Sequence, residues 1–194
     1  MKTTFLGFIL LTLMTTNAFS AVDASKLAKK KQTPQGKYLT AVEAYKMLEN
    51  ESKDILFIDV RTRAEIEFVG MTSLVDMNIP YMTQDIDSWN EKKNKFDMAP
   101  NSNFSIVFAD AIKAKGMNKQ SKVIVMCRSG SRSSKAANLL DGLGYKNVYT
   151  IVDGFEGDKA KTGPNKGQRI VNGWKNAQLP WSYKLAQAKM YFEE

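Results

Sequence analysis

The chain has 194 residues, with 28 lysines and arginines against 20 aspartates and glutamates, no histidine and one cysteine. A sequence without histidine cannot build a Ser-His-Asp triad, a Cys-His pair or a His-ligated metal site, and a single cysteine excludes internal disulfides, Cys-x-x-Cys redox pairs and cysteine-rich zinc sites. A carboxylate site for calcium or magnesium stays open, and Cys127 is the candidate nucleophile.

The first 20 residues have the pattern of a secretory signal peptide. Lys2 gives a positive start, an apolar run extends from Phe5 to Met14, and Ala18 and Ser20 are small residues before a cut between Ser20 and Ala21. The run is shorter than the roughly 20 apolar residues that span a bilayer. We therefore expect export to a bacterial periplasm, or secretion, without a stable membrane anchor. A disordered apolar N-terminus or a short uncleaved anchor is the alternative.

Positive charge is spread along the chain and is not gathered in one motif. Residues 21–37 are polar, rich in lysine and aperiodic, which predicts a basic linker. The net charge of +8 could suggest nucleic acid, but the lysines are scattered or lie in expected loops, without a nucleic-acid-binding motif. We expect no nucleic-acid partner, and solvated charge that attracts small anions.

Three short apolar runs predict buried parallel strands. They are residues 55–60, 123–126 and 148–152. Thr40 and Glu43 form a capping box that opens an amphipathic helix before the first run. A second helical pattern, between the last two runs, ends at Gly144. Strand, helix and strand with short connections make a right-handed parallel crossover, so the predicted fold class is α/β.

Two longer connections fit this scheme less well. Residues 82–121 are long for one connection, and within them Asn101-Ser102-Asn103 predicts the cap of a helix that ends at Gly116. Residues 156–173 are rich in lysine and glycine and predict an excursion loop.

A short loop separates the second run from the helix after it. It reads Cys127-Arg128-Ser129-Gly130-Ser131-Arg132. This is the carboxyl end of a strand, where open α/β sheets bind ligands, and the N–H groups of the following helix favour an anion. The two arginines add charge, the two serines can donate hydrogen bonds, and the glycine permits a tight turn. Such features stabilise a thiolate, so the cysteine can be a nucleophile without a histidine base. An incidental cysteine beside ordinary capping serines is the alternative.

The loop resembles the active-site loop of single-domain rhodanese-like sulfurtransferases. Further motifs agree in order over about residues 38–183. They are Ile58-Asp59-Val60-Arg61 with Glu65 and Gly70, Asn78-Ile79-Pro80, Gly144 to Tyr149, Asp153-Gly154-Phe155, and Trp174 to Ala177 with Leu179-Pro180. The resemblance implies a three-layer domain with a central, mainly parallel sheet flanked by helices. It also implies insertions at about 82–121 and 158–173 and a C-terminal tail at 184–194.

The resemblance also implies the chemistry. Sulfurtransferases of this family have a six-residue loop, whereas related Cys-x5-Arg phosphatases have one residue more; here Ser133 stands at the phosphatase arginine position. In the implied mechanism Cys127 takes the outer sulfur of a small anionic donor such as thiosulfate and becomes a persulfide, which the loop from Arg128 to Arg132 holds. A thiol or cyanide-like acceptor then removes the sulfur. No metal or organic cofactor is implied, and a periplasmic redox or sulfur-carrying protein is a candidate partner.

Other residues receive supporting interpretations. Asp59 and Arg61 end the first strand, and we expect them to pair and fix the neighbouring loop rather than to react. Glu65 and Glu67 are expected on a solvated helix face with one inward position. Ser129 stands where two-domain thiosulfate-specific members carry a basic residue, so thiosulfate is not singled out as the natural donor.

Two other functions stay open. The two insertions suggest a rhodanese-fold module that binds or senses sulfur species, or docks a partner, without turnover. A phosphatase-like or arsenate-reducing enzyme is the third hypothesis, and the loop length disfavours it.

Overall fold

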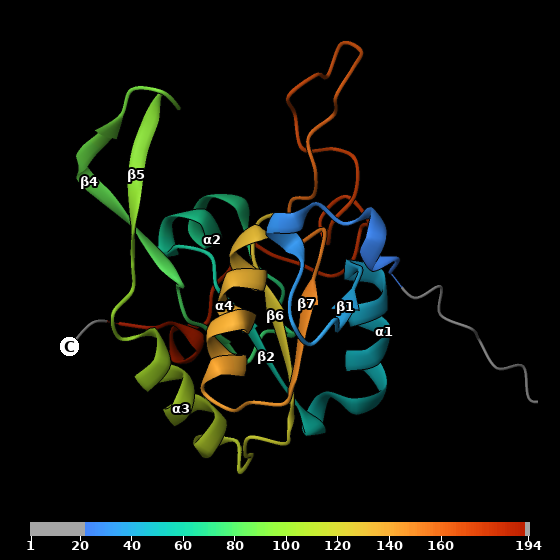
Figure 1. The fold of residues 1–194 in the computed structure, drawn as a ribbon, viewed down its shortest axis with the longest axis vertical. Helices are drawn as coiled ribbons and strands as arrows, with labels where there is room; N and C mark the ends of the chain where they lie inside the picture. Colours follow the sequence, from blue (N-terminus) through green and yellow to red (C-terminus); the bar gives the residue numbers. More distant parts are fainter. Residues whose placement is uncertain (1–21, 193–194) are drawn as a thin grey trace, which may run out of the picture.

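The computed structural model describes residues 22–192, and its centre is a five-stranded sheet in the order β1-β7-β6-β2-β3 (Figure 1). The strands are β1 (Tyr38–Leu39), β2 (Ile55–Asp59), β3 (Met77–Asn78), β6 (Lys122–Met126) and β7 (Asn147–Ile151). Every neighbouring pair in this sheet is parallel. The α/β class and the three predicted strands are therefore confirmed. The expected signal peptide lies outside the described residues.

Alternation along the central strands divides the core between the two faces of the sheet. Leu56 and Ile58 of β2 join one apolar cluster, whereas Ile55 and Phe57 join the other. The first cluster is closed by α3 (Phe104–Ala114) and α4 (Ser131–Gly142), and the second by α1 (Ala41–Glu51) and α2 (Arg63–Val69). Because side chains of a strand point to opposite faces in turn, both faces need a helical cover, which produces the expected three layers.

Capping residues mark the ends of the helices. Thr40 caps α1 and Thr62 caps α2, each in a reciprocal capping box with the glutamate three residues later. After α4 the chain turns at Gly144, whose φ is 91°, a left-handed conformation that glycine adopts without strain. The capping box of α1 and the end of α4 were predicted.

Residues 82–100 form an antiparallel hairpin that no sequence pattern predicted. Its strands are β4 (Met82–Asn90) and β5 (Lys95–Pro100), and it projects from the body of the domain (Figure 1). Its residues are half-buried or exposed, so it lacks the continuous apolar run that marks a central strand. The expected helix after it is α3, with Asn103 as the N-cap.

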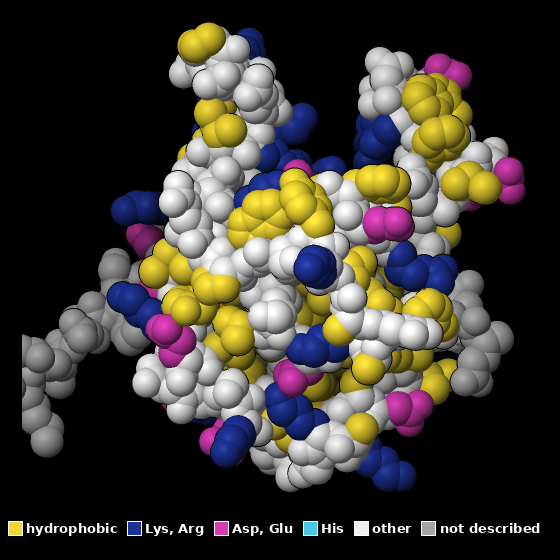
Figure 2. All heavy atoms as spheres, turned by 180° about the vertical axis from the view of Figure 1, so that it is seen from behind, with side chains coloured by type: hydrophobic (Ala, Val, Ile, Leu, Met, Phe, Trp, Pro, Cys, Tyr) yellow, Lys and Arg dark blue, Asp and Glu magenta, His cyan; other side chains and the backbone are white. Residues whose placement is uncertain are grey.

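The basic excursion around residues 158–170 is a second projection at the same end of the molecule (Figures 1 and 2). We call it the finger. Its two limbs are bridged at Lys159 and Arg169. The space-filling view shows the finger and the hairpin standing on either side of one face (Figure 2).

The segments on either side of the expected domain pack against it. Residues 29–31, within the expected linker, form a 3-10 turn, and Lys31 is buried with its Nζ 2.8 Å from Asp158 Oδ1. In the expected tail, Tyr191 is buried and its N–H bonds to the Asn78 carbonyl beside β3. Both segments thus belong to the folded unit, which differs from their description as a linker and a tail. The remaining 3-10 turns are Ala24–Lys26, Ser52–Asp54 and Gln187–Lys189.

No helix between residues 22 and 192 is long and apolar enough to cross a membrane. In the same part of the chain, no three acidic or thiol side chains gather into a group that could hold a metal ion.

Candidate active site

Cys127 follows the last residue of β6, at the carboxyl edge of the parallel sheet. Its side chain continues the alternation of Val123 and Val125 and so points toward the α4 side of the sheet. Only 1% of the residue is exposed. The chain then turns through Arg128 to Gly130 and enters α4 at Ser131. A strand end and a helix start thus hold the sulfur at the positive end of the helix dipole.

One group of the loop and one side chain of α4 contact the sulfur directly. The backbone N–H of Gly130 donates to Cys127 Sγ at 3.2 Å. The thiol in turn lies 3.5 Å from Ser133 Oγ, and this hydroxyl donates to the Gly130 carbonyl at 3.0 Å. Ser133 is fully buried in the first turn of α4. A hydroxyl that can turn toward the sulfur and an N–H already aimed at it are suited to hold a sulfur anion.

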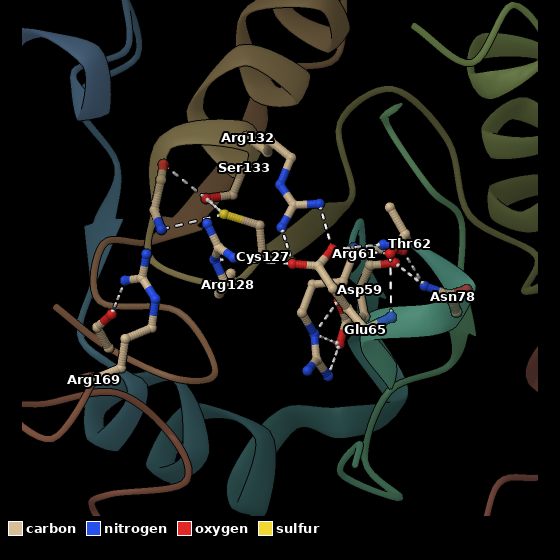
Figure 3. Close-up of polar contacts among 12 residues, drawn as sticks. Asp59, Arg61, Thr62, Glu65, Asn78, Cys127, Arg128, Arg132, Ser133 and Arg169 are labelled. Carbon is tan, nitrogen blue, oxygen red and sulfur yellow. Dashed lines mark hydrogen bonds and ion pairs between the residues drawn. The ribbon is translucent and has the colours of Figure 1, made fainter. Parts of the chain in front are cut away.

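Arg132 makes a two-pronged ion pair with Glu65 beside the loop (Figure 3). Arg132 Nη1 donates to Glu65 Oε2 at 2.6 Å, and Nη2 donates to Oε1 at 2.5 Å. The same carboxylate accepts from the Thr62 N–H at 3.0 Å. Glu65 is thus the inward position of its helix, and Arg132 is not the uncompensated cation that the sequence suggested. Its fork positions the first turn of α4 against α2.

The ion pair shifts the pKa of both partners. Burial alone would raise the pKa of Glu65, but the hydrogen bonds and charge of Arg132 outweigh it and lower that pKa to about 2. Burial alone would lower the pKa of Arg132, but Glu65 outweighs it and, with smaller contributions from Cys127 and Asp59, raises that pKa above its usual value. Both groups are therefore charged at neutral pH.

The loop rests on the turn that follows β7. The Phe155 N–H donates to the Cys127 carbonyl at 2.8 Å, and the Glu156 N–H donates to the Arg128 carbonyl at 3.0 Å. Gly154 has a φ of +65°, and a Cβ there would meet the Cys127 carbonyl oxygen at 2.4 Å. Only glycine permits this approach, so the Asp153-Gly154-Phe155 motif fixes the position of the Cys127 loop against the turn after β7.

Asp59 and Arg61 form the expected structural pair under the site. Arg61 Nη2 lies 2.6 Å from Asp59 Oδ2, and both side chains are fully buried. The same Nη2 donates to the Gly70 carbonyl at 2.9 Å, and the guanidinium lies 3.9 Å from the centre of the Phe155 ring. The pair therefore joins the end of β2 to the Gly70 turn and to the turn that supports the loop. Neither side chain contacts the sulfur in Figure 3.

A pocket of about 330 Å³ opens above Cys127, between the loop and the hairpin. Arg128, Ser129, Ser131 and Arg132 line its loop side, together with Thr62 and Glu65. Its other wall comes from the hairpin, through Met82, Gln84, Lys95, Phe96 and Met98. The hairpin, which belongs to the long connection of residues 82–121, thus forms one wall of the pocket.

Two further arginines, Arg128 and Arg169, lie near Cys127 (Figure 3). The Arg128 side chain is 44% exposed, and its Nε is 3.9 Å from Glu65 Oε1, a long contact. Arg169 comes from the finger and donates to the Gly157 carbonyl at 2.5 Å. Burial and then the charge of Arg128 lower the pKa of Arg169. The carboxylates of Glu156 and Asp158 raise the pKa of Arg169, each by less than Arg128 lowers it. Two cations beside a thiol favour an anion there.

The structure brings together all six predicted loop residues and sets Asp59 and Arg61 beneath them. Sequence reasoning missed three contributions: Ser133 against the sulfur, Glu65 as the partner of Arg132, and Arg169 from the finger. A signal existed for Glu65 alone, since Thr62-x-x-Glu65 is a capping box that turns the glutamate back toward the chain.

Comparisons with other proteins agree with this architecture. A protein of Rickettsia rickettsii, named "Uncharacterized protein RP600 homolog", is 34% identical over 145 residues, which cover 75% of this chain and 96% of that protein. The Thiosulfate sulfurtransferase GlpE of Tolumonas auensis is 46% identical over 41 residues, or 21% of this chain and 39% of that protein. The crystal structure of Rv0390 from M. tuberculosis superposes with a TM-score of 0.58 at 28% identity, over 76% of this chain and 97% of that one.

The family model described as "Rhodanese-like domain" matches residues 40–161, a range that contains β2, the hairpin and the whole Cys127 loop. Because this model matches more than half of the chain, the chain belongs to the rhodanese-like domain family.

Proposed function

We propose that the protein is a sulfurtransferase that carries sulfane sulfur on Cys127. The observation that carries the proposal is the setting of the sulfur: it accepts the Gly130 N–H at 3.2 Å, at the N-terminus of α4, and faces a pocket with Arg128 on its rim. These groups stabilise a thiolate and its persulfide without a histidine base. The local similarity to the Tolumonas thiosulfate sulfurtransferase supports the same chemistry.

The proposed reaction has two displacements. The Cys127 thiolate attacks the outer sulfur of thiosulfate, the S–S bond of the donor breaks, and sulfite leaves with the bonding electron pair. Cys127 then carries the persulfide. Cyanide in an assay, or a thiolate, attacks the outer sulfur, and the electron pair of the broken bond returns to Cys127. Arg128 and the N-terminus of α4 hold the anionic donor, and the N–H of Gly130 holds the sulfur anion.

Steady-state turnover tests this proposal. Thiocyanate formed from thiosulfate and cyanide is expected with the wild-type chain and is expected to fall to background in Cys127→Ser, whose fold is checked by its urea unfolding curve. Turnover that survives in Cys127→Ser would overturn the proposal. Sulfur uptake without turnover would favour the binding or sensing alternative, and hydrolysis of an aryl phosphate would favour the phosphatase-like one.

We propose further that the reaction takes place after export, with a redox or sulfur-carrying protein as partner. This rests on the signal-like pattern of residues 1–20 alone. Fractionation of cells expressing the full chain tests it: the periplasmic fraction is expected to hold a protein that begins near Ala21. An uncleaved cytoplasmic protein would overturn it.

A further inference from the structure

One face of the hairpin is turned toward Cys127. Met82 and Gln84 of β4 line the pocket, and so do Phe96 and Met98 of β5. Each pair is two residues apart, and Gln84 lies directly opposite Met98 in the register. Because alternate residues of a strand share a face, these four side chains form one surface, which we call the inner face of the hairpin.

The inner face is mostly apolar and adaptable. Two of its four side chains are thioethers, which are flexible, polarizable and fit irregular carbon skeletons. The opposite face carries Thr83, Asp85 and Asp97, and alternation along β5 starts Lys95 on that same face. Lys95 stands at the end of β5, and its long side chain reaches the pocket from there. The domain thus turns its apolar hairpin face to the active site, although a purely inorganic donor has no carbon for that face to contact.

Charge on the pocket is unevenly compensated. Glu65 neutralises Arg132 through two short hydrogen bonds, but touches Arg128 only at 3.9 Å. Lys95 is an exposed residue of β5 that also lines the pocket, and no carboxylate of residues 22–192 lies within ion-pair distance of it. Two cations therefore line the pocket: Arg128 beside the sulfur, and Lys95, whose side chain reaches it from the end of β5.

The volume of the pocket also indicates a ligand larger than thiosulfate. A volume of about 330 Å³ is at the lower end of the range that holds drug-sized organic ligands. Thiosulfate, with five heavy atoms, leaves most of it empty. The space that thiosulfate leaves is the part walled by the inner face and Lys95.

From these observations we propose that the hairpin is a substrate-binding element, and that the site exchanges sulfur with an organic thiol whose carboxylate pairs with Lys95 and whose carbon chain lies on Met82 and Met98. This rests on the proposed function, because the same Cys127 sulfur reacts. The Cys127 thiolate attacks the outer sulfur of R–S–SH, the S–S bond breaks, and R–S⁻ leaves with the electron pair. The hydrogen stays on the transferred sulfur, now on Cys127, and the reverse reaction loads the thiol.

The test uses glutathione persulfide, its diethyl ester and thiosulfate as donors to the full-length chain. Lys95→Ala is expected to raise the KM for glutathione persulfide about fivefold with kcat unchanged, the loss expected for one exposed ion pair. With the diethyl ester, whose carboxylates carry no charge, wild type and Lys95→Ala are expected to have the same KM. Met98→Ala is expected to raise the KM for acid and ester alike.

Matched controls lie on the same hairpin. Lys93→Ala removes the same charge at the hairpin turn, away from the pocket, and Thr83→Ala truncates a residue of the opposite face; both are expected to behave as wild type. An equal effect of Lys95→Ala and Lys93→Ala, or of Lys95→Ala on acid and ester, would overturn the proposal. If thiosulfate loads Cys127 but glutathione persulfide does not, only the hairpin proposal fails; if neither loads it, the sulfurtransferase proposal fails.

Discussion

The ion pair between Glu65 and Arg132 gives a quantitative prediction for Glu65→Gln. The Glu65 side chain is 19% exposed, and its pKa falls from the usual 4.5 to about 2 because of Arg132. A shift of that size corresponds to roughly 3 kcal/mol of folding stability at neutral pH. The glutamine retains the shape and loses the charge, so we expect Glu65→Gln to unfold at pH 7 with about 2 to 3 kcal/mol less free energy than wild type.

The pH dependence follows from the sign of the shift. The pKa of Glu65 is lower in the folded state, so the folded chain binds fewer protons, and the stabilisation is complete above the unfolded pKa near 4.5. It is lost as the pH falls through about 2, with roughly 2 kcal/mol gone by pH 3. The difference between wild type and Glu65→Gln is therefore expected to shrink to about 1 kcal/mol at pH 2.5.

Urea unfolding followed by tryptophan fluorescence measures this difference, because Trp174 is fully buried and reports the loss of the core. Glu67→Gln is the control, since Glu67 is an exposed residue of the same helix; it is expected to stay within about 0.5 kcal/mol of wild type. A wild-type advantage over Glu65→Gln that is the same at pH 7 and pH 2.5 would refute the reasoning, as would equal losses in the two variants.

Three more variants probe the loop and its surroundings. Gly154→Ala places a Cβ 2.4 Å from the Cys127 carbonyl oxygen and is expected to lower the free energy of unfolding in urea by about 3 kcal/mol or more. Gly163→Ala is the control: its Cβ would meet nothing within 4 Å, so only its positive φ is unfavourable, and we expect a loss of about 1 kcal/mol. Equal losses in the two variants would contradict the close approach at Gly154. Ser133→Ala removes a hydroxyl 3.5 Å from the sulfur and is expected to slow persulfide formation about tenfold in stopped-flow mixing with thiosulfate, and an unchanged rate would remove Ser133 from the site. Arg169→Ala is expected to raise the KM for thiosulfate about fivefold in the cyanide-coupled assay. Lys166→Ala, also on the finger, is expected to leave this KM unchanged. The same KM in both variants would show that Arg169 does not bind the anion.

What the sequence predicted follows from how much apolar surface each segment buries. The strands β2, β6 and β7 are covered on both faces, so each is an unbroken apolar run that reveals itself locally. Neither face of the hairpin is fully buried, and its half-buried and exposed residues follow one another without regular alternation. That pattern is too weak to separate from a polar loop, which is why residues 82–100 were expected only as part of a long connection.

The same difference governs the active site. The loop from Cys127 to Arg132 is contiguous, so its residue types and spacing predicted the cysteine, the glycine turn and the nearby charge. The partner of Arg132 is 67 residues away in the chain, and only the packing of α2 against the start of α4 brings Glu65 to it. Arg169 and Lys95 reach the site from the finger and the hairpin. The local sequence does not predict the direction in which either of these segments projects.

The most direct test of the central claim is the intact mass of the full-length chain after incubation with thiosulfate. We predict a gain of one sulfur atom per chain, which cyanide removes, and which Cys127→Ser does not show while it unfolds in urea as wild type does. An unchanged mass in a folded wild-type chain, with thiosulfate and with glutathione persulfide alike, or an equal gain in Cys127→Ser, would contradict the account.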